Sequence, residues 1–283
     1  MEIRPLGEHT GVEVLGIDLA CPVDEDTRSR LNRAFVEMSV LVVRDQHLEP
    51  SGVVAAVRLF GQVFPQQNTR FAVAGCPEIH YVSNQDTFPD GRRYIPGDDW
   101  HTDHSNATRP PKATVLHAVD LPDEGGDTQY ANMAEAYDDL PTRLRERIAP
   151  LMGIHVYQSS HSARQLVALS DADKERVPNA VLHPIVRTHP ETGRQAIYIN
   201  PIRIEGIVGL DHKEALPLLG ELLVHATQER YQYRHRWRPG DLVMWDNRCL
   251  LHKANGDYDM RQKRYLYRIM LQGDVPRQAA PAH

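Results

Sequence analysis

Two separate parts of the chain carry residue types that can bind a metal. The first is His101-Thr102-Asp103, and the second is His252, which lies beyond the predicted strand 241–245. On an extended backbone, residues i and i+2 point to the same face, so His101 and Asp103 can present an imidazole and a carboxylate to one point. Two histidines and one carboxylate on one side of a metal form the facial triad of non-haem Fe(II) oxygenases, which leaves positions open for substrates.

Further residues suit the binding of an organic acid. Arg264 lies 12 residues after His252, and Thr128 ends the segment Gly125-Gly126-Asp127-Thr128. A guanidinium can bind a carboxylate through two parallel hydrogen bonds, and a hydroxyl can add a third. A histidine two residues before an aspartate is a weak signal by itself, because the chain contains 15 histidines and chance matches are expected. The added arginine and threonine strengthen the prediction of a metal site.

The bulk composition excludes several classes of partner. The chain has 283 residues, with 32 Lys and Arg against 38 Asp and Glu, which gives a formal net charge of −6. A nucleic-acid-binding protein would favour a basic surface, so we expect no nucleic-acid partner. No apolar run reaches the roughly 18 residues of a membrane-spanning helix. Three cysteines without a C-x-x-C pattern indicate a reducing, cytoplasmic compartment rather than a disulfide framework.

The elements that must position these residues are mostly strands. Helical periodicity is confined to 24–38, 52–60 and 214–228, whereas the runs with strand character are 11–19, 40–44, 79–83, 113–119, 181–187, 196–200, 231–237, 241–245 and 265–271. This order lacks the regular strand–helix alternation of a parallel sheet, so it favours an antiparallel barrel or sandwich with helical buttresses. We expect a single domain over 1–283, a helical N-terminal buttress at about 20–62, and a frayed tail at 275–283.

Taken together, these motifs resemble the Fe(II)/2-oxoglutarate-dependent dioxygenases of the taurine dioxygenase and 2,4-dichlorophenoxyacetate dioxygenase (TauD/TfdA) family. The matching segments, in the family's order, are 16–19, 40–44, 100–103, 110–111, 125–128, 183–190, 245–248 and 252, with Arg264 and Arg268. The resemblance covers nearly the whole chain. It implies a double-stranded β-helix, the jelly roll or cupin-like barrel, flanked by helices.

The resemblance also implies a role for each motif residue. It assigns Fe(II) to His101, Asp103 and His252, the distal carboxylate of 2-oxoglutarate to Thr128 and Arg264, and the pocket wall to Trp245. Arg268 matches the arginine that this family directs at the substrate anion or at the cosubstrate carboxylates. The implied reaction consumes O2 and 2-oxoglutarate, hydroxylates an aliphatic C–H of a small organic acid, and releases succinate and CO2. Homodimers or homotetramers are usual in this family.

Contacts to the substrate are less well defined by the motifs. His104, Asn106 and Tyr157 are candidates to line the substrate pocket. The alternatives for His104 are a role as a fourth metal ligand or a purely structural role. Arg203, which follows Asn200-Pro201-Ile202, is expected to form a surface salt bridge, with a second anion contact as the alternative. An aryloxyalkanoate-like acid is the leading substrate, with sulfonates and alkyl sulfates as alternatives. The stretch 61–79 lacks the histidine that taurine-cleaving members use, which argues against taurine.

Two rival functions come from other classes. A zinc hydrolase is one, because His101-Thr102-Asp103-His104 partly matches the H-x-H-x-D-H metallohydrolase signature. The residue two before His101 is Asp99 rather than histidine, so that pattern fails. A non-enzymatic cupin-like binder is the other. The triad, Thr128 and Arg264 together have little use without a cosubstrate, so the dioxygenase interpretation is preferred.

Overall fold

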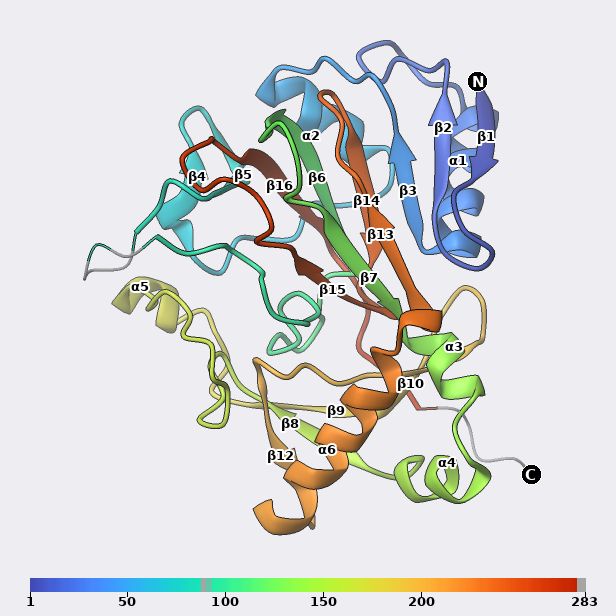
Figure 1. The fold of residues 1–283 in the computed structure, drawn as a ribbon, viewed down its shortest axis with the longest axis vertical. Coiled ribbons are helices and arrows are strands. Elements are labelled where there is room, and N and C mark those ends of the chain that lie inside the picture. Colours follow the sequence, from blue (N-terminus) through green and yellow to red (C-terminus); the bar gives the residue numbers. More distant parts are fainter. Residues whose placement is uncertain (88–90, 92, 279–283) are drawn as a thin grey trace.

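The protein is mainly β, with helices around the strands (Figure 1). Its computed structural model describes residues 1–87, 91 and 93–278. The strands are β1 (Glu2–Pro5), β2 (Val12–Leu15), β3 (Val40–Val43), β4 (Ala72–Val73), β5 (Cys76–Ser83), β6 (Ala113–Asp120), β7 (Thr128–Asn132), β8 (Met152–His155), β9 (Val181–Pro184), β10 (Val186–Thr188), β11 (Gln195–Ile197), β12 (Ile204–Ile207), β13 (Gln232–His235), β14 (Leu242–Asp246), β15 (Leu250–Ala254) and β16 (Tyr265–Leu271). The helices are α1 (Glu25–Met38), α2 (Pro50–Arg58), α3 (Met133–Asp138), α4 (Thr142–Ile148), α5 (Asp171–Lys174) and α6 (His212–Ala226), with 3-10 turns at Thr69–Phe71 and Glu229–Tyr231. The predicted mainly β class with flanking helices is confirmed.

The largest sheet joins strands from both ends of the chain, in the order β1-β2-β3-β14-β6-β16-β5-β4. β14 pairs antiparallel with β3 on one side and with β6 on the other. All four residues of β3 and all five of β14 are buried. Strands that are covered on both faces are rich in Val, Leu and Ile because every position then faces apolar contacts. This sheet therefore holds the segment before β6 close to the segment after β14.

The expected N-terminal buttress corresponds to α1 and α2, with β3 between them joining the sheet. Asp24 caps α1 by accepting a hydrogen bond from the backbone N–H of Thr27. Ser39 ends the helix in the left-handed conformation, with a φ of 60°. Leu31 and Phe35 are buried against the large sheet, in one cluster with β3 and β14 residues. The apolar stripe predicted for residues 24–38 is thus the face that supports the sheet.

Smaller sheets complete the β structure, in the orders β13-β7-β15, β12-β8-β9 and β10-β11. The predicted strand runs 181–187 and 196–200 contribute β10 and β11, which pair antiparallel as a hairpin. In the sheet β13-β7-β15, β15 pairs with β7 so that His252 lies opposite Tyr130. The described strands form these four sheets rather than one closed barrel.

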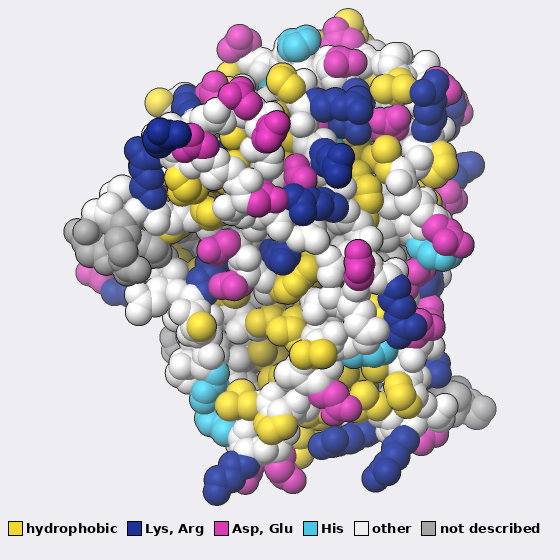
Figure 2. All heavy atoms as spheres, in the orientation of Figure 1, with side chains coloured by type: hydrophobic (Ala, Val, Ile, Leu, Met, Phe, Trp, Pro, Cys, Tyr) yellow, Lys and Arg dark blue, Asp and Glu magenta, His cyan; other side chains and the backbone are white. Residues whose placement is uncertain are grey.

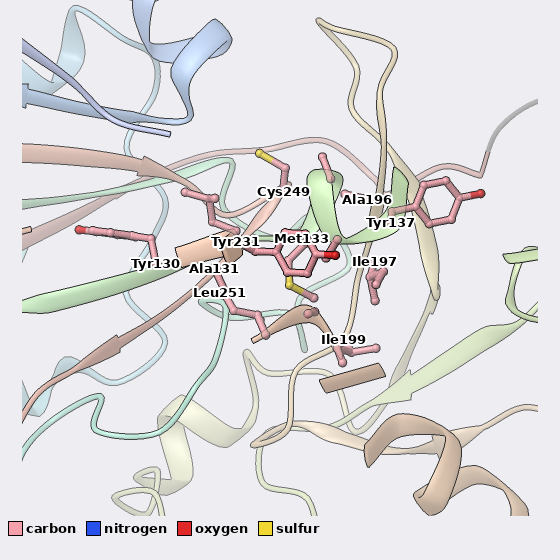
Figure 3. Close-up of a cluster of buried hydrophobic side chains, with 14 of the residues drawn as sticks. Tyr130, Ala131, Met133, Tyr137, Ala196, Ile197, Ile199, Tyr231, Cys249 and Leu251 are labelled. Atoms are coloured by element: carbon pink, nitrogen blue, oxygen red, sulfur yellow. The ribbon is translucent and has the colours of Figure 1, made fainter. Parts of the chain in front are cut away.

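A buried apolar cluster joins the small sheets to α3. Figure 3 shows Tyr130 and Ala131 of β7, Met133 of α3, and Ile197 of β11 within it. Met133 and Ile197 are each 1% exposed, so water is excluded where α3 packs against β11. Burial of a large apolar side chain contributes about 1.5–3 kcal/mol relative to exposure. The cluster therefore fixes β7 and β15, the strands that carry Thr128 and His252.

The outer surface carries both signs of charge, and Lys, Arg, Asp and Glu side chains are interspersed over the face in Figure 2. No helix in the described ranges is long and apolar enough to cross a membrane. Residues 279–283 of the expected frayed tail lie outside the described residues. The carbonyl of Arg277, just before them, accepts a hydrogen bond from the backbone N–H of Thr188.

Candidate active site

His101, Asp103 and His252 lie together at the inner end of a cavity. The backbone N–H of His101 donates to the carbonyl of His252 at 3.0 Å, and that of His252 donates back at 2.8 Å. This bridge joins the segment before β6 to β15 and places the two imidazole centroids 4.1 Å apart. One ligand atom from each of the three residues lies within 4.8 Å of the others. Three donors at these separations can surround one ion at the usual bond lengths of about 2.0–2.2 Å.

Hydrogen bonds fix the direction of two of these side chains. Nδ1 of His101 lies 2.7 Å from the carbonyl oxygen of Asp99, so Nδ1 carries the proton and Nε2 keeps its lone pair. The Thr114 hydroxyl donates to Oδ2 of Asp103 at 2.6 Å, and Nδ2 of Asn247 donates to the Thr114 oxygen at 2.9 Å. Such supporting contacts orient metal ligands and tune their affinity. Thr114 and Asn247 were not predicted as site residues, although Asn247 belongs to a matching motif.

The ionisation of the three side chains fits a divalent cation. Burial lowers the pKa of His252 to about 4 and that of His101 well below its ordinary value, so both imidazoles are neutral at pH 7. Burial opposes the ionisation of Asp103, but the adjacent His252 and Arg268 outweigh it and lower the pKa of this carboxyl. Nε2 of His252 lies 3.7 Å from Oδ2 of Asp103, which is too far for a direct hydrogen bond. Two neutral imidazoles and one carboxylate form the donor set that Fe(II) accepts.

The backbone after Asp103 differs from the expected extended form. Residues 103–106 form a turn, and His104 has a φ of 42°, in the left-handed region. The turn brings His104 into the wall of the same cavity as His101, where an extended strand would have pointed it away. Nδ1 of His104 lies 2.6 Å from Oε1 of Gln67, which also accepts from Nδ2 of Asn106 at 3.1 Å. Asn106 is fully buried behind the cavity and does not line it.

Arg264 and Thr128 face the cavity near the triad. Arg264 is 2% exposed, and its Nε donates to the carbonyl of Gly126 at 2.9 Å. A Cβ at Gly126 would lie 3.2 Å from the Arg264 side chain, so this glycine permits the close approach. Nη2 of Arg264 is buried and has no hydrogen-bond partner within the described part of the chain. The Thr128 oxygen accepts from Nε1 of Trp237 at 3.1 Å, which leaves its own O–H free to donate.

Trp245 and Arg268 complete the inner wall. The Trp245 ring lies 4.6 Å from that of His252, centroid to centroid. Nη1 of Arg268 lies 3.7 Å from Oδ1 of Asp103, and its Nη2 donates to Nδ1 of His80 at 3.0 Å. His80 was not predicted as a site residue. It lies within the strand run that forms β5, and its position there gives no sign of a functional role. Its acceptor role toward Arg268 shows that it is neutral.

The cavity has a volume of about 600 Å³, which is within the usual range for small-molecule sites. Of the ten predicted site residues, nine line it: His101, Asp103, His104, Thr128, Tyr157, Trp245, His252, Arg264 and Arg268. The sequence did not predict Arg164 there, and it favoured a surface salt bridge over an anion contact for Arg203. Arg203 is instead 9% exposed, lines the cavity, and has no ion-pair partner within the described ranges.

A second cluster with metal-binding residue types, formed by His189, Asp246 and Cys249, is already satisfied by protein contacts. The Asp246 carboxylate accepts hydrogen bonds from Arg248 and from Nε2 of His189. Burial raises the pKa of the Cys249 thiol to about 12, so it is protonated at neutral pH. This cluster therefore stabilises the turn after β14 and is a poor metal site.

Comparison with known proteins settles the family. The family model for "Taurine catabolism dioxygenase TauD, TfdA family" matches residues 2–270. The chain belongs to the TauD/TfdA family. Members are alpha-ketoglutarate-dependent dioxygenases, so the chain is an oxidoreductase whose reaction requires Fe(II), 2-oxoglutarate and O2. Neither a zinc hydrolase nor a non-enzymatic binder is supported by this membership.

Relatives match over almost their full length. The chain is 36% identical to an alpha-ketoglutarate-dependent 2,4-dichlorophenoxyacetate dioxygenase of Cupriavidus pinatubonensis, covering 96% of this chain and 98% of the relative. It is 34% identical to an (S)-phenoxypropionate/alpha-ketoglutarate-dioxygenase of Sphingobium herbicidovorans, covering 100% and 98%. An alpha-ketoglutarate-dependent sulfate ester dioxygenase of Pseudomonas putida is 30% identical, covering 98% and 91%.

Solved structures agree with these matches. A taurine dioxygenase from Burkholderia xenovorans superposes with a TM-score of 0.82 at 33% identity, covering 97% of this chain and 92% of the other. AAD-2 in complex with Mn(II) and N-oxalylglycine also gives 0.82, at 30% identity, covering 97% and 98%. The expected double-stranded β-helix fold of this family is thereby confirmed.

Proposed function

We propose that this enzyme hydroxylates an aliphatic C–H of a small organic acid, and that the acid is aryloxyalkanoate-like. The observation that carries the proposal is that His101, Asp103 and His252 share one cavity with the buried guanidinium of Arg264 and the half-buried guanidinium of Arg268. The relatives that act on 2,4-dichlorophenoxyacetate and phenoxypropionate support the aryloxy class. The sulfate ester relative keeps alkyl sulfates as a second candidate, at lower identity.

In this proposal His101, Asp103 and His252 hold Fe(II), and Arg264 with Thr128 binds the distal carboxylate of 2-oxoglutarate. Nη2 of Arg264 is buried without a partner in the described part of the chain, and an incoming carboxylate would satisfy it. The bound metal and 2-oxoglutarate supply the oxidising chemistry that inserts one oxygen atom of O2 into a C–H bond, with release of succinate and CO2. Trp245, whose ring packs beside that of His252, would line the pocket near the metal.

Arg268 would bind the anionic group of the substrate, because its guanidinium faces the cavity beside Asp103. Tyr157 and His104 would contact the remainder of the acid. The Tyr157 hydroxyl donates to the carbonyl of Val167 at 2.9 Å, which holds the ring against the cavity. Asn106 acts behind this wall, through Gln67, and orients His104. The chain thus has to place one C–H at the metal, and fixed side chains achieve this by limiting the poses of the acid.

The enzyme is proposed to act in the cytoplasm, as a single domain and as a homodimer or homotetramer. The free state of Cys21, Cys76 and Cys249 supports a reducing compartment, and the family match over most of the chain supports one domain. The oligomeric state rests on the family resemblance, and sedimentation analysis would test it.

The test is succinate formation from 2-oxoglutarate with Fe(II), in the presence of phenoxyacetate, phenoxypropionate, an alkyl sulfate or taurine. We expect stimulation by an aryloxyalkanoate and none by taurine. His252→Gln should abolish turnover, whereas His47→Gln, a change of an exposed histidine, should leave it unchanged. If succinate forms only with the alkyl sulfate, the aryloxy assignment is wrong; if it forms with none of these acids, the substrate class is wrong.

A further inference from the structure

Three arginines besides Arg264 line the cavity: Arg164, Arg203 and Arg268. Arg268 lies at the inner end, beside Asp103. Arg203 precedes β12, and Arg164 belongs to the long connection between β8 and α5. One of these guanidiniums suffices to bind a single carboxylate. The other two therefore require a separate explanation.

Arg203 is a buried cation without an acid. Its Nη1 donates to the carbonyl of Tyr157 at 2.7 Å, and its guanidinium lies 5.1 Å from the centre of the Tyr157 ring. Burial lowers the pKa of Arg203 to about 10, and the charges of Arg268 and Arg164 add to the effect. The described residues supply no carboxylate in ion-pair distance of it. A buried charge without a partner is unfavourable, so this arrangement favours the binding of an anion.

Arg164 is held in place but is poorly paired. Its Nη1 is buried and has no hydrogen-bond partner among the described residues, and the nearest carboxylate oxygen, of Asp98, is 3.6 Å away. The Asp98 side chain is 51% exposed, so this ion pair is weak. The Gln158 side chain donates to the carbonyl of Arg164 and accepts from the N–H of Leu166. The loop around Arg164 is thereby ordered before any ligand binds.

Four arginines and four aspartates line the cavity, but within the described ranges Asp103 is the one buried acid among them, whereas Arg203 and Arg264 are both buried. Fe(II), the Asp103 carboxylate and doubly charged 2-oxoglutarate together carry one negative charge, which Arg264 balances. Of the other lining acids in the described ranges, Asp98 and Asp99 are exposed, and Asp86 is half-buried and accepts from the Tyr81 hydroxyl. A substrate with one negative charge would neutralise Arg268 and leave Arg203 and Arg164 facing the cavity.

We propose that Arg203 and Arg164 form a second anion site, so that the prime substrate is a small diacid with one acidic group on Arg268 and the other on these two arginines. This inference rests on the proposed function and narrows its substrate class. Arginine suits the role because its planar guanidinium binds a carboxylate or another oxyanion through paired hydrogen bonds. The Tyr157 ring, on which Arg203 lies, also lines the cavity and can contact the part of the acid between its two charged groups.

The test uses calorimetric titration of the full-length protein with Mn(II) and N-oxalylglycine in place of the reactive metal and cosubstrate. The probes are 2-, 3- and 4-carboxyphenoxyacetate, each paired with the carbamoyl compound of the same shape and one charge fewer. We expect at least one diacid to bind about tenfold or more tightly than its amide, as a charge-assisted hydrogen bond predicts. Arg203→Gln and Arg164→Gln should each remove most of this preference and leave amide binding within about twofold.

Arg28→Gln, which removes an exposed arginine of α1, is the matched control and should leave the preference intact. Arg164 is on a surface loop, so its variant keeps the test decisive if Arg203→Gln does not fold. If no diacid binds more tightly than its amide, or if the preference survives both cavity variants, the second anion site is wrong.

Succinate assays with Fe(II) on the same pairs separate this result from the proposed function. A diacid preference in binding without succinate would support the site and contradict oxygenation of these acids. Succinate from the amides at the same affinity as from the diacids would support the proposed function and overturn the second site.

Discussion

The hydroxyl of Thr114 donates a 2.6 Å hydrogen bond to Oδ2 of Asp103. Thr114 in turn accepts from Asn247, which also accepts from the backbone N–H of Asp103 at 3.4 Å. The carboxylate proposed to bind iron is therefore held by β6 and by the turn after β14. This contact links the geometry of the metal site to the centre of the large sheet.

Replacing Thr114 with valine should weaken metal binding. Valine keeps the shape of threonine but removes the hydrogen bond to Asp103, so the affinity for Fe(II) should fall about 10–100-fold. Thr114→Ser should retain most of the affinity. Metal titration of the purified variants would measure the effect. Thr188→Val is the control, because the buried hydroxyl of Thr188 has no hydrogen-bond partner in the described part of the chain. Equal losses of Fe(II) affinity in the two valine variants would refute the role of Thr114.

Arg264→Ala should abolish tight binding of 2-oxoglutarate and spare the metal site. Breaking a buried charge pair costs about 3–5 kcal/mol, which corresponds to a loss of more than about a hundredfold in affinity. Arg264→Lys should retain a part of it, since lysine keeps the charge but not the paired hydrogen bonds. Titration of 2-oxoglutarate into the metal-bound protein measures both. Unchanged affinity in the alanine variant would show that Arg264 does not bind the cosubstrate.

Arg268→Gln should act on the prime substrate. We expect its KM for the acid to rise about tenfold or more, because a charge-assisted hydrogen bond contributes about 1.5–3 kcal/mol. The slow consumption of 2-oxoglutarate without substrate should persist. Succinate formation measured against acid concentration gives both values. A KM equal to that of the parent enzyme would indicate that Arg268 is structural.

The metal-free protein should lose stability in mild acid. Burial lowers the pKa of His183 and of His252 to about 4. The unfolded chain binds protons near the ordinary histidine pKa of about 6.5, so their contribution is present above that pH and is lost as the pH falls toward 4. Between pH 7 and pH 5 each should cost about 2 kcal/mol of unfolding free energy.

Urea unfolding at both pH values would measure this loss. His183→Gln should reduce the pH dependence by about that amount. The same substitution at the exposed His47 is the control and should not reduce it. A His183→Gln protein with the full pH dependence would contradict the assignment.

Asp246→Asn should destabilise the fold strongly. Asp246 is fully buried and pairs with Arg248 and His189, so its neutralisation leaves the Arg248 guanidinium short of its buried partner. We expect a loss of about 3–5 kcal/mol in unfolding free energy. The exposed pair of Asp138 with Arg194 provides the control, since Asp138→Asn should change it by less than about 1 kcal/mol. Similar losses at both sites would contradict this interpretation.

The sequence alone predicted the mainly β class, the three longest helices and the motif residues proposed to bind the metal, but it did not predict β7 and β15, the strands that carry Thr128 and His252. The helix at 24–38 could be predicted because its apolar spacing and its capping aspartate are local signals. His101, Asp103, His252 and Arg264 could be identified because their residue types and order match a family whose chemistry requires them. These features depend on neighbours in the chain or on matched motifs, so no tertiary information was needed.

Only the tertiary structure decided which other side chains enter the cavity. His80 has the pattern of one position in a strand, Arg164 that of a loop residue, and Arg203 fits a surface salt bridge better than an anion contact. Nothing in their local sequence indicates that the three side chains meet in one cavity. The left-handed turn at His104 and the burial of Asn106 follow from contacts with Gln67, more than 35 residues earlier. The positive charge that faces the substrate comes from arginines of distant elements, and only folding brings these residues into one cavity.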